Sequence, residues 1–421
     1  MEFDAINSEK KYCQRQAIIF NSFNQIITNT LTGDIMVLFL TDVLLFKTVN
    51  ITFIISLIPL IALIRLPLIF VLRRCNKVKI IELSIYIKIA YVIILLTIPW
   101  NVLDMWKYTA LIIIYQVAVE FGVGICWQPL MKEITSERDR GQFFSNMRFL
   151  FMTLNTIFVF LLSLVVGAEM NHTQYKALLL ISLFGFFVQI YAIRKISRQQ
   201  IISEYNGAIQ KKTLLKLLTD NKNILWALIL DFIFICIGFT LNVVYLKTVL
   251  GYSSKLVSLY ITINNLGGTV SLPIIGRLLD RNLRKGSRYI IFLYLAYMII
   301  LIMLPAYLPG NIFNILFIIA LALLSGMIAS GVYLFMTMIQ HSLVNIEDSF
   351  IVLNIYQIVI YVATFIITNI FGVVISRAVT DKAPINYWFS VDLFKAVNIL
   401  IILISIGVIN KMLSEKSYIF S

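Results

Sequence analysis

The sequence has little charge for its length. Asp, Glu, Lys and Arg make up 13% of its 421 residues, about half the share that a soluble domain carries. Hydrophobic residues make up 60%, and apolar runs of about 20 residues recur along the whole chain. A water-soluble core does not need this much apolar sequence. We therefore expect a protein whose solvent is the lipid bilayer and whose backbone polar groups are satisfied within helices.

Several functional patterns are missing. The four cysteines are scattered, without the spacing of a metal site or a disulfide framework. We find no nucleotide-binding loop, no nucleophile–base arrangement and none of the alternating segments of a membrane barrel. We expect no enzyme activity, no metal and no cofactor. The formal net charge of +14 does not indicate nucleic-acid binding, because the basic residues lie in short loops between apolar runs.

Twelve apolar segments are long enough to span a membrane. They are expected at residues 16–45, 50–72, 80–100, 108–130, 142–167, 175–194, 223–246, 254–276, 288–308, 312–338, 350–376 and 388–410. With the N-terminus inside, 25 of the 35 Lys and Arg residues fall in the inner segments and 7 in the outer ones. This bias predicts a multi-pass protein of the cell inner (cytoplasmic) membrane, with both termini cytoplasmic.

The longest inner connection divides the chain near its middle. We expect an N-terminal half at residues 1–195, a cytoplasmic central loop at 196–222 and a C-terminal half at 223–421. An offset of 208 residues relates Arg73 to Arg281 and Asn146 to Asn354. These few matches are what two related halves of a transporter predict.

The segment GRLLDRNLRKGSR, residues 276–288, joins the eighth and ninth spans. It resembles the loop signature of the major facilitator superfamily, which reads Gly, three residues, Asp, a basic residue, any residue, Gly and two basic residues. The positions that fit are Gly276, Leu278, Asp280, Arg281, Arg284 and Lys285. The corresponding loop after the second span, IFVLRRCNKVK, keeps the basic Arg73 but lacks the Asp.

A second resemblance lies in SERDRGQFFSNMRF, residues 136–149. Its Arg140, Gly141, Phe143, Phe144 and Arg148 look like the loop between the fourth and fifth spans of many bacterial permeases in this superfamily. The resemblance covers nearly the whole chain. It implies an all-α membrane protein with twelve transmembrane helices in two pseudo-symmetric six-helix halves, which works as a monomer.

The resemblance also implies a cytoplasmic gate between the halves. Its expected members are Gly276, Asp280, Arg281, Arg284, Lys285, Arg140, Gly141, Arg148 and Arg73. The alternative is that the basic residues only keep these loops inside. Asp280 fits that alternative poorly, because acidic residues contribute little to the orientation rule.

Ionisable residues inside spans are costly and are therefore candidates for function. Glu120 lies in the fourth span, Asp231 in the seventh and Asp34 in the first. By the resemblance, these spans line a central cavity, so all three acids are candidate proton carriers. Lys88 of the third span is either a cavity residue or a fixed partner of Glu120. Arg65 lies toward the inner end of the second span, and we expect its guanidinium to reach water there.

Uncharged polar residues are also concentrated in a few spans. The candidates for the substrate cavity are Asn24, Gln25, Asn29, Asn264, Asn265 and Gln357. Such side chains either hydrogen-bond between helices or hold a polar solute, and either role explains their positions.

Together these features predict a secondary active transporter that moves a small solute by alternating access, with protons as the coupling ion and efflux slightly favoured. One alternative is an uptake permease for a polar metabolite such as a sugar or a peptidoglycan fragment. Another is a non-transporting membrane sensor or scramblase of the same fold. The expected partners are a small-molecule solute, protons and the lipid bilayer.

Overall fold

The computed structural model describes most of the first half of the chain and parts of the second. The described residues are 2–72, 75–135, 140–197, 242–249, 251–281, 312–343, 357–366 and 368–370, with the single residues 289, 292, 293, 296, 354 and 407. They are all in helices or short connections, and no strand occurs among them. The central loop lies outside the described residues except for its first two positions.

Six described helical segments are long and apolar enough to cross a membrane. They run over Glu9–Val43, Thr48–Ile69, Lys77–Thr97, Met105–Met131, Asn146–Val165 and His172–Ser197. These ranges confirm the first six expected spans. The first helix, α1 (Glu2–Leu31), starts well before the apolar run does, so its polar first turns extend beyond the expected span.

Three of these spans are broken into shorter helices. The first continues from α1 through α2 (Asp34–Leu38) into the π-helix η1 (Phe39–Val43). The second consists of α3 (Thr48–Ile61), the 3₁₀ turn η2 (Ala62–Ile64) and α4 (Arg65–Leu72). The fourth consists of α6 (Met105–Val119), the π-helix η4 (Glu120–Gly124) and α7 (Ile125–Ile134).

The breaks in the second and fourth spans lie at charged residues, and the first of the two has an identifiable cause. Pro59 sits inside α3, where it removes a backbone hydrogen bond, and the 3₁₀ turn follows it. Arg65 is the first residue of α4. Glu120 is the first residue of η4, and single π turns inside α-helices are frequent at functional sites.

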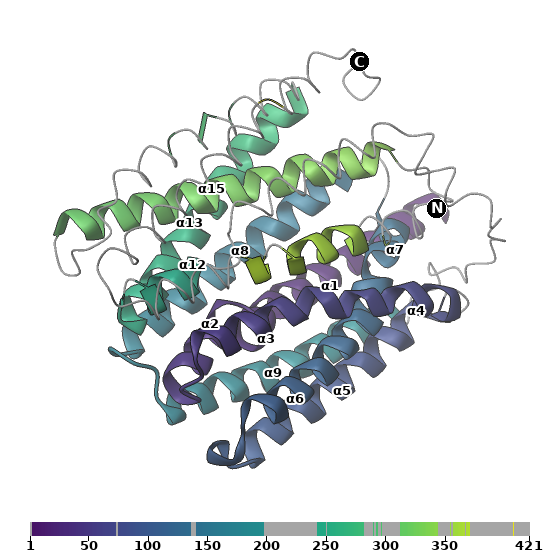
Figure 1. The fold of residues 1–421 in the computed structure, drawn as a ribbon. Coiled ribbons are helices and arrows are strands. Elements are labelled where there is room, and N and C mark those ends of the chain that lie inside the picture. The colour runs from purple at the N-terminus through teal and green to yellow at the C-terminus, as the bar shows by residue number, and fades with distance from the viewer. Residues whose placement is uncertain are drawn as a thin grey trace.

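The remaining helices complete the packing shown in Figure 1. They are α5 (Lys77–Thr97), α8 (Arg140–Val165), α9 (His172–Ser197), α12 (Asn242–Val244), η6 (Tyr245–Val249), α13 (Ser254–Arg281) and α15 (Ile312–Leu343). A 3₁₀ turn, η3 (Trp100–Val102), joins α5 to α6. Helix α1 packs against α8 and α9, whereas α13 packs against α15 and α8. Helix α8 thus connects the N-terminal spans to the later ones.

Glycines allow α13 and α15 to approach closely. A Cβ added at Gly326 would overlap the carbonyl oxygen of Asn264, and one at Gly267 would overlap the carbonyl oxygen of Leu323. The Asn264 side-chain amide donates to Ser325 Oγ at 3.0 Å across the same contact. Small residues of this kind are the usual means by which membrane helices approach closely.

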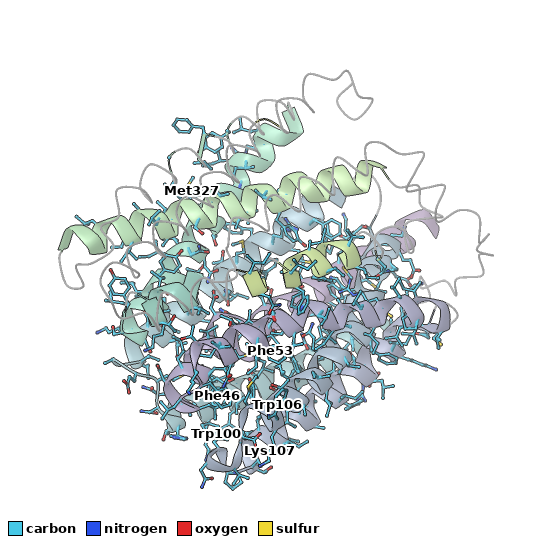
Figure 2. All side chains as sticks on the ribbon, in the orientation of Figure 1. Phe46, Phe53, Trp100, Trp106, Lys107 and Met327 are labelled. Atoms are coloured by element: carbon cyan, nitrogen blue, oxygen red, sulfur yellow. The ribbon has the colours of Figure 1, made fainter. Side chains whose placement is uncertain are left out.

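Aromatic residues gather at the end of the spans that carries Lys47, which the charge distribution assigns to the outside and which we call the outer end. Phe39 stacks on Tyr175 with ring centroids 3.8 Å apart, and Trp100 meets Phe39 edge-on at 5.2 Å. Trp100, Trp106 and Lys107 lie together at this end in Figure 2. Trp106 is 70% exposed, as expected for an aromatic residue at a membrane–water interface.

Candidate transport site

Arg65 and Glu120 form a buried ion pair between the second and fourth spans. Arg65 Nε donates to Glu120 Oε2. The two residues are only 3% and 2% exposed. Because α4 begins at Arg65 and η4 begins at Glu120, both charged groups lie at the irregular turns of their spans. Two charges at this depth are tolerated only when they are paired and hydrogen-bonded.

Four further residues complete the cluster. Gln116 Nε2 donates to Glu120 Oε1 at 2.9 Å, so both carboxylate oxygens have a partner. Arg65 Nη1 donates to Gln357 Oε1, and the guanidinium lies 5.0 Å from the ring centroid of Tyr361. A Cβ at Gly124 would overlap Glu120 Oε2 and lie 2.8 Å from Arg65 Nη2. Only glycine leaves room for the pair at this position.

This cluster reaches across the two expected halves. Arg65 and Glu120 belong to the N-terminal half, whereas Gln357 and Tyr361 belong to the eleventh expected span. We call this boundary between the two expected halves the seam. A second contact along it joins Ser56 Oγ to Asn369 Oδ1 at 3.3 Å. Arg65 thus connects a buried carboxylate in one half to polar groups of the other.

One alternative and one expectation about this site were wrong. The alternative partner of Glu120 was Lys88, but the described partners of Glu120 are Arg65 and Gln116. Arg65 was expected to extend to water at the inner end, but it turns inward and is buried. A nearby carboxylate offers the guanidinium a stronger interaction than the membrane surface does, because the pair lies in a medium of low dielectric constant.

Lys88 is buried elsewhere in the N-terminal half. It is 1% exposed, and its ammonium lies 5.5 Å from the ring centroid of Phe186 on α9. Ser182 and Gln189 share that face of α9, one turn to either side of Phe186, and each is fully buried with an unpartnered side-chain oxygen among the described residues. Lys88 is therefore a buried amine with no carboxylate among its described partners.

The polar candidates fall into two groups. Asn24 accepts from Gln189 Nε2 at 3.1 Å, Asn29 donates to Asn155 at 3.3 Å, and Asn264 bonds Ser325. These three connect helices. The side chains of Gln25 and Asp34 are half-buried, with no hydrogen bond or ion pair among the described residues. Asn265 Nδ2 is buried without a partner in the described part of the chain.

A second charged cluster joins the halves at the outer end, and the sequence analysis did not single it out. Asp42 Oδ1 lies 2.8 Å from Lys247 Nζ, and Asp42 Oδ2 accepts from the backbone N–H of Met170 at 2.8 Å and from the Ser254 hydroxyl. The Lys247 ammonium also donates to Ser254 Oγ at 2.7 Å. We call Asp42, Met170, Lys247 and Ser254 the outer clasp.

Backbone hydrogen bonds reinforce the outer clasp. Ser254 N–H donates to the Ala168 carbonyl at 2.8 Å, and Lys255 N–H donates to the Gly167 carbonyl at 3.0 Å. The connection between α8 and α9 is thereby fixed to the first turn of α13. At this end the described parts of the two halves are held together.

One of the expected gate residues contacts the opposite half. The guanidinium of Arg148 on α8 lies 3.4 Å from the ring centroid of Tyr333 on α15, and Arg148 is 6% exposed. Gly276 lies on α13 with open space around it. Arg73, Arg284, Lys285 and the cavity candidate Asp231 lie outside the described residues, as do the side chains of Arg140, Asp280 and Arg281. Gly141 lies in the first turn of α8.

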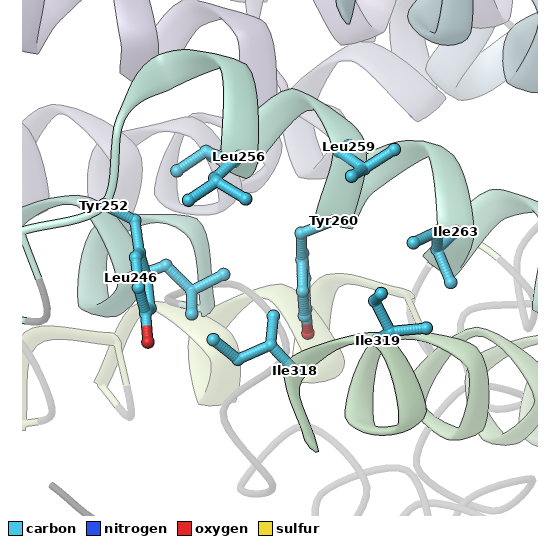
Figure 3. A pocket seen from close by; sticks show the side chains of 9 residues that line it. Leu246, Tyr252, Leu256, Leu259, Tyr260, Ile263, Ile318 and Ile319 are labelled. Carbon is cyan, nitrogen blue, oxygen red and sulfur yellow. The ribbon is translucent and has the colours of Figure 1, made fainter. Parts of the chain in front are cut away.

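An apolar pocket lies in the C-terminal half, between α13 and α15 (Figure 3). It encloses about 380 Å³, including space open to its surroundings, and is lined by Leu246, Tyr252, Leu256, Val257, Leu259, Tyr260, Ile263, Ile318 and Ile319. The rings of Tyr252 and Tyr260 lie roughly parallel across it. Its lining carries no charged residue.

Known structures match this chain over nearly its full length. A variant of the nucleoside transporter NupG matches with a TM-score of 0.69 and 14% identity, over 94% of this chain and 99% of the other. A bacterial homologue of the human peptide transporters PepT1 and PepT2 matches with a TM-score of 0.68 and 12% identity, over 96% and 98%. The chain has the major facilitator superfamily fold.

This likeness confirms the fold class expected from the sequence. The xylose transporter XylE from E. coli has the same arrangement, with a TM-score of 0.61 and 14% identity over 94% of this chain and 97% of the other. No family model and no curated protein matches the sequence. At such low identities the major facilitator superfamily fold is shared, while the solutes of these transporters are properties of those proteins.

Proposed function

We propose that this protein is a proton-coupled secondary transporter that moves a small polar solute across a membrane by alternating access. The fold supports this proposal, because the solved structures that share it are transporters of nucleosides, xylose and peptides. The observation that carries the proton coupling is the position of Arg65, which is bonded at once to the Glu120 carboxylate and to Gln357 of the other half.

The geometry suggests how a proton would alter the contact between the halves. When Glu120 is ionised, it holds the Arg65 guanidinium in place by charge and hydrogen bonding. A proton on Glu120 removes that attraction and leaves a buried guanidinium without its counter-charge, which is costly. Arg65 must then find other partners, and its bond to Gln357 changes with it. Protonation in one half is in this way linked to contacts with the other.

The outer clasp and the Arg148–Tyr333 contact complete the proposal. They hold the halves together at two places along the seam, and alternating access requires that the contacts at the two ends break in turn. We assign Arg148 to the inner contact, together with Gly276, Asp280, Arg281 and the neighbouring basic residues expected from the sequence. Glu120 is the proton carrier that we favour, and Asp34 and Asp231 remain candidates for additional proton sites.

The contacts of Glu120 also bear on the choice between efflux and uptake. Efflux was slightly favoured from the sequence because buried acids suit lipophilic cations. In the described structure the Glu120 carboxylate is already occupied by Arg65 and Gln116, which removes the reason for that preference. A polar solute is the better match to a site made of a guanidinium, two amides and a tyrosine, so we propose uptake of a polar metabolite over efflux of lipophilic cations.

The test begins by identifying the solute from thermal stabilisation of the purified protein by sugars, peptides, nucleosides, organic anions and lipophilic cations. The solute found is then followed in liposomes. We expect accumulation to require a proton gradient. Glu120→Gln should keep exchange of labelled for unlabelled solute, because its side chain is permanently neutral, and should lose gradient-driven accumulation. Accumulation that persists after the pH gradient is collapsed would show that protons are not the coupling ion.

A further inference from the structure

We infer that the transported solute carries an oxyanion, a carboxylate or a phosphate, which takes the place of Glu120 on Arg65. This inference rests on the proposed function, because it names the class of solute for the same site. Three features of the Arg65 cluster lead to it: the single counter-charge of Arg65, the occupied carboxylate and the partners supplied by the opposite half.

Arg65 has one charged partner among the described residues. Its guanidinium contacts the Glu120 carboxylate, the Gln357 amide oxygen and the face of the Tyr361 ring. A guanidinium does not give up its proton in proteins, so its charge persists when Glu120 is neutralised. An unpaired charge at this depth costs several kcal/mol. An anionic group on the solute is the natural replacement for the lost carboxylate charge.

The same contacts disfavour a cationic solute. Both oxygens of Glu120 are engaged, one by Arg65 and the other by Gln116. A solute cation would have to displace Arg65 and then remain beside its positive charge. Lys88, another buried basic side chain in this half, has a ring but no carboxylate as its described partner. The contacts of the Arg65 cluster thus favour an added anion over an added cation.

The partners from the opposite half suit an oxyanion. The planar guanidinium presents forked N–H donors that match the two oxygens of a carboxylate or a phosphate. Gln357 and Tyr361 are only partly buried, so this side of Arg65 is less enclosed than the side facing Glu120. An oxyanion that bound here would lie at the seam between the halves. A movement of the halves that changes the Arg65–Gln357 contact would therefore also change the binding of the oxyanion.

Thermal unfolding of the purified protein in detergent tests this inference without a membrane or a gradient. Glu120→Gln stands for the protonated state, and the double variant Glu120→Gln, Arg65→Gln removes the guanidinium as well. Each protein is titrated with sodium acetate, sodium benzoate and sodium phosphate at constant ionic strength. Acetamide and benzamide serve as uncharged controls of matched shape.

We expect at least one oxyanion to raise the melting temperature of the Glu120→Gln protein saturably, with an apparent affinity at least tenfold tighter than for the unchanged protein. The amides and the double variant should show no such rise. A response to the carboxylates alone, or to phosphate alone, identifies which anionic group the solute carries. If no oxyanion stabilises Glu120→Gln, or if the double variant responds equally, the inference is wrong.

A second measurement covers the case in which Glu120→Gln does not fold. The unchanged protein is then titrated with benzoate and benzamide, and benzoate must bind at least tenfold more tightly than benzamide, because only the anion can replace the Glu120 carboxylate on Arg65. Equal binding of benzoate and benzamide would overturn the inference. Because neither experiment measures flux, a negative result leaves the transport proposal standing, and a failure of transport in liposomes would leave a positive anion result standing.

Discussion

The carboxylate of Asp42 lies 2.8 Å from the ammonium of Lys247 and joins the first span to the seventh. The Asp42 side chain is 3% exposed and that of Lys247 is 13% exposed. Ion pairs on an open surface contribute little, but this one is nearly enclosed and shares its atoms with Ser254 and the Met170 N–H. Its rupture must accompany any opening of the outer end.

Asp42→Asn should therefore weaken the closed outer end by about 2 kcal/mol, or roughly 30-fold in the population of the open state. The measurement is hydrogen–deuterium exchange of a peptide covering residues 251–257, because the N–H groups of Ser254 and Lys255 are bonded to Ala168 and Gly167. Exchange there should accelerate by about that factor in the variant.

The exchanged pair Asp42→Lys, Lys247→Asp should restore much of this protection. Asp104→Asn is the matched control, since Asp104 pairs with Lys107 at 3.2 Å at the same end but both side chains are more than half exposed. Asparagine at position 104 can still accept the hydrogen bond from the Lys107 N–H that caps the N-terminus of α6. Equal acceleration in the control, or none in Asp42→Asn, would mean that the outer clasp does not hold this end closed.

Gly124→Ala should disrupt the Arg65–Glu120 pair without changing a charge. The added Cβ would overlap Glu120 Oε2 and lie 2.8 Å from Arg65 Nη2. We expect gradient-driven accumulation in liposomes to fall by at least tenfold, with the protein still folded. Gly167→Ala is the control, because a Cβ there meets nothing within 4 Å. Full activity in Gly124→Ala would show that the pair is not needed in this geometry.

The sequence was sufficient to predict the first six spans. Long apolar runs and the distribution of Lys and Arg are local properties of the sequence, and they determine which segments insert in the bilayer and in which orientation. The same reasoning made Glu120 a candidate site residue, since a carboxylate within a span is costly. The sequence did not identify Arg65 as the partner of Glu120. The 3₁₀ turn after Pro59 and the π turn at Glu120 change the rotation of the two spans, and regular helical spacing cannot predict that change.

The outer clasp was missed for a related reason. Lys247 was counted as one of the loop residues that set orientation, and Asp42 lies near the end of a span where charge is inexpensive. Neither is unusual alone. Their pairing depends on the packing of the first span against residues near the start of α13, which are more than 200 positions away in the sequence. Opposite charges at the outer ends of the first and seventh spans were the available signal.

Gly326→Ala should separate α13 from α15. The added Cβ would overlap the Asn264 carbonyl oxygen and lie 2.9 Å from the backbone nitrogen of Gly268. Backbone atoms cannot move aside as a side-chain end can, so we expect a loss of about 3 kcal/mol or more in the free energy of unfolding. Leu323→Ala, an exposed change on the same helix, should cost far less. Denaturation in mixed micelles would measure both, and similar losses would contradict the close packing.

Arg148 and Tyr333 offer a test of the contact between α8 and α15. Their distance of 3.4 Å from guanidinium carbon to ring centroid, with Arg148 buried, predicts a cation–π interaction of about 1–2 kcal/mol. Both residues have other interactions as well, so single substitutions would not isolate the pair. A double-mutant cycle with Arg148→Gln and Tyr333→Leu does so, and its coupling free energy should fall in that range.

The Arg148–Tyr333 cycle has two internal checks. Tyr333→Phe keeps the ring and should retain most of the coupling, because the interaction depends on the ring face rather than on the hydroxyl. The pair Lys195 and Tyr191 lies within α9, with the Lys195 ammonium 5.3 Å from the ring centroid of Tyr191, and the Tyr191 ring is exposed. This pair should give a coupling near zero in the same assay, because contact with the surroundings screens it. Coupling that vanishes in Tyr333→Phe, or that is no larger than for Lys195 and Tyr191, would mean that Arg148 serves only as one of the basic residues that keep this end of the chain inside. Coupling of the expected size would show that Arg148 also holds the two halves together, because α15 belongs to the opposite half from α8.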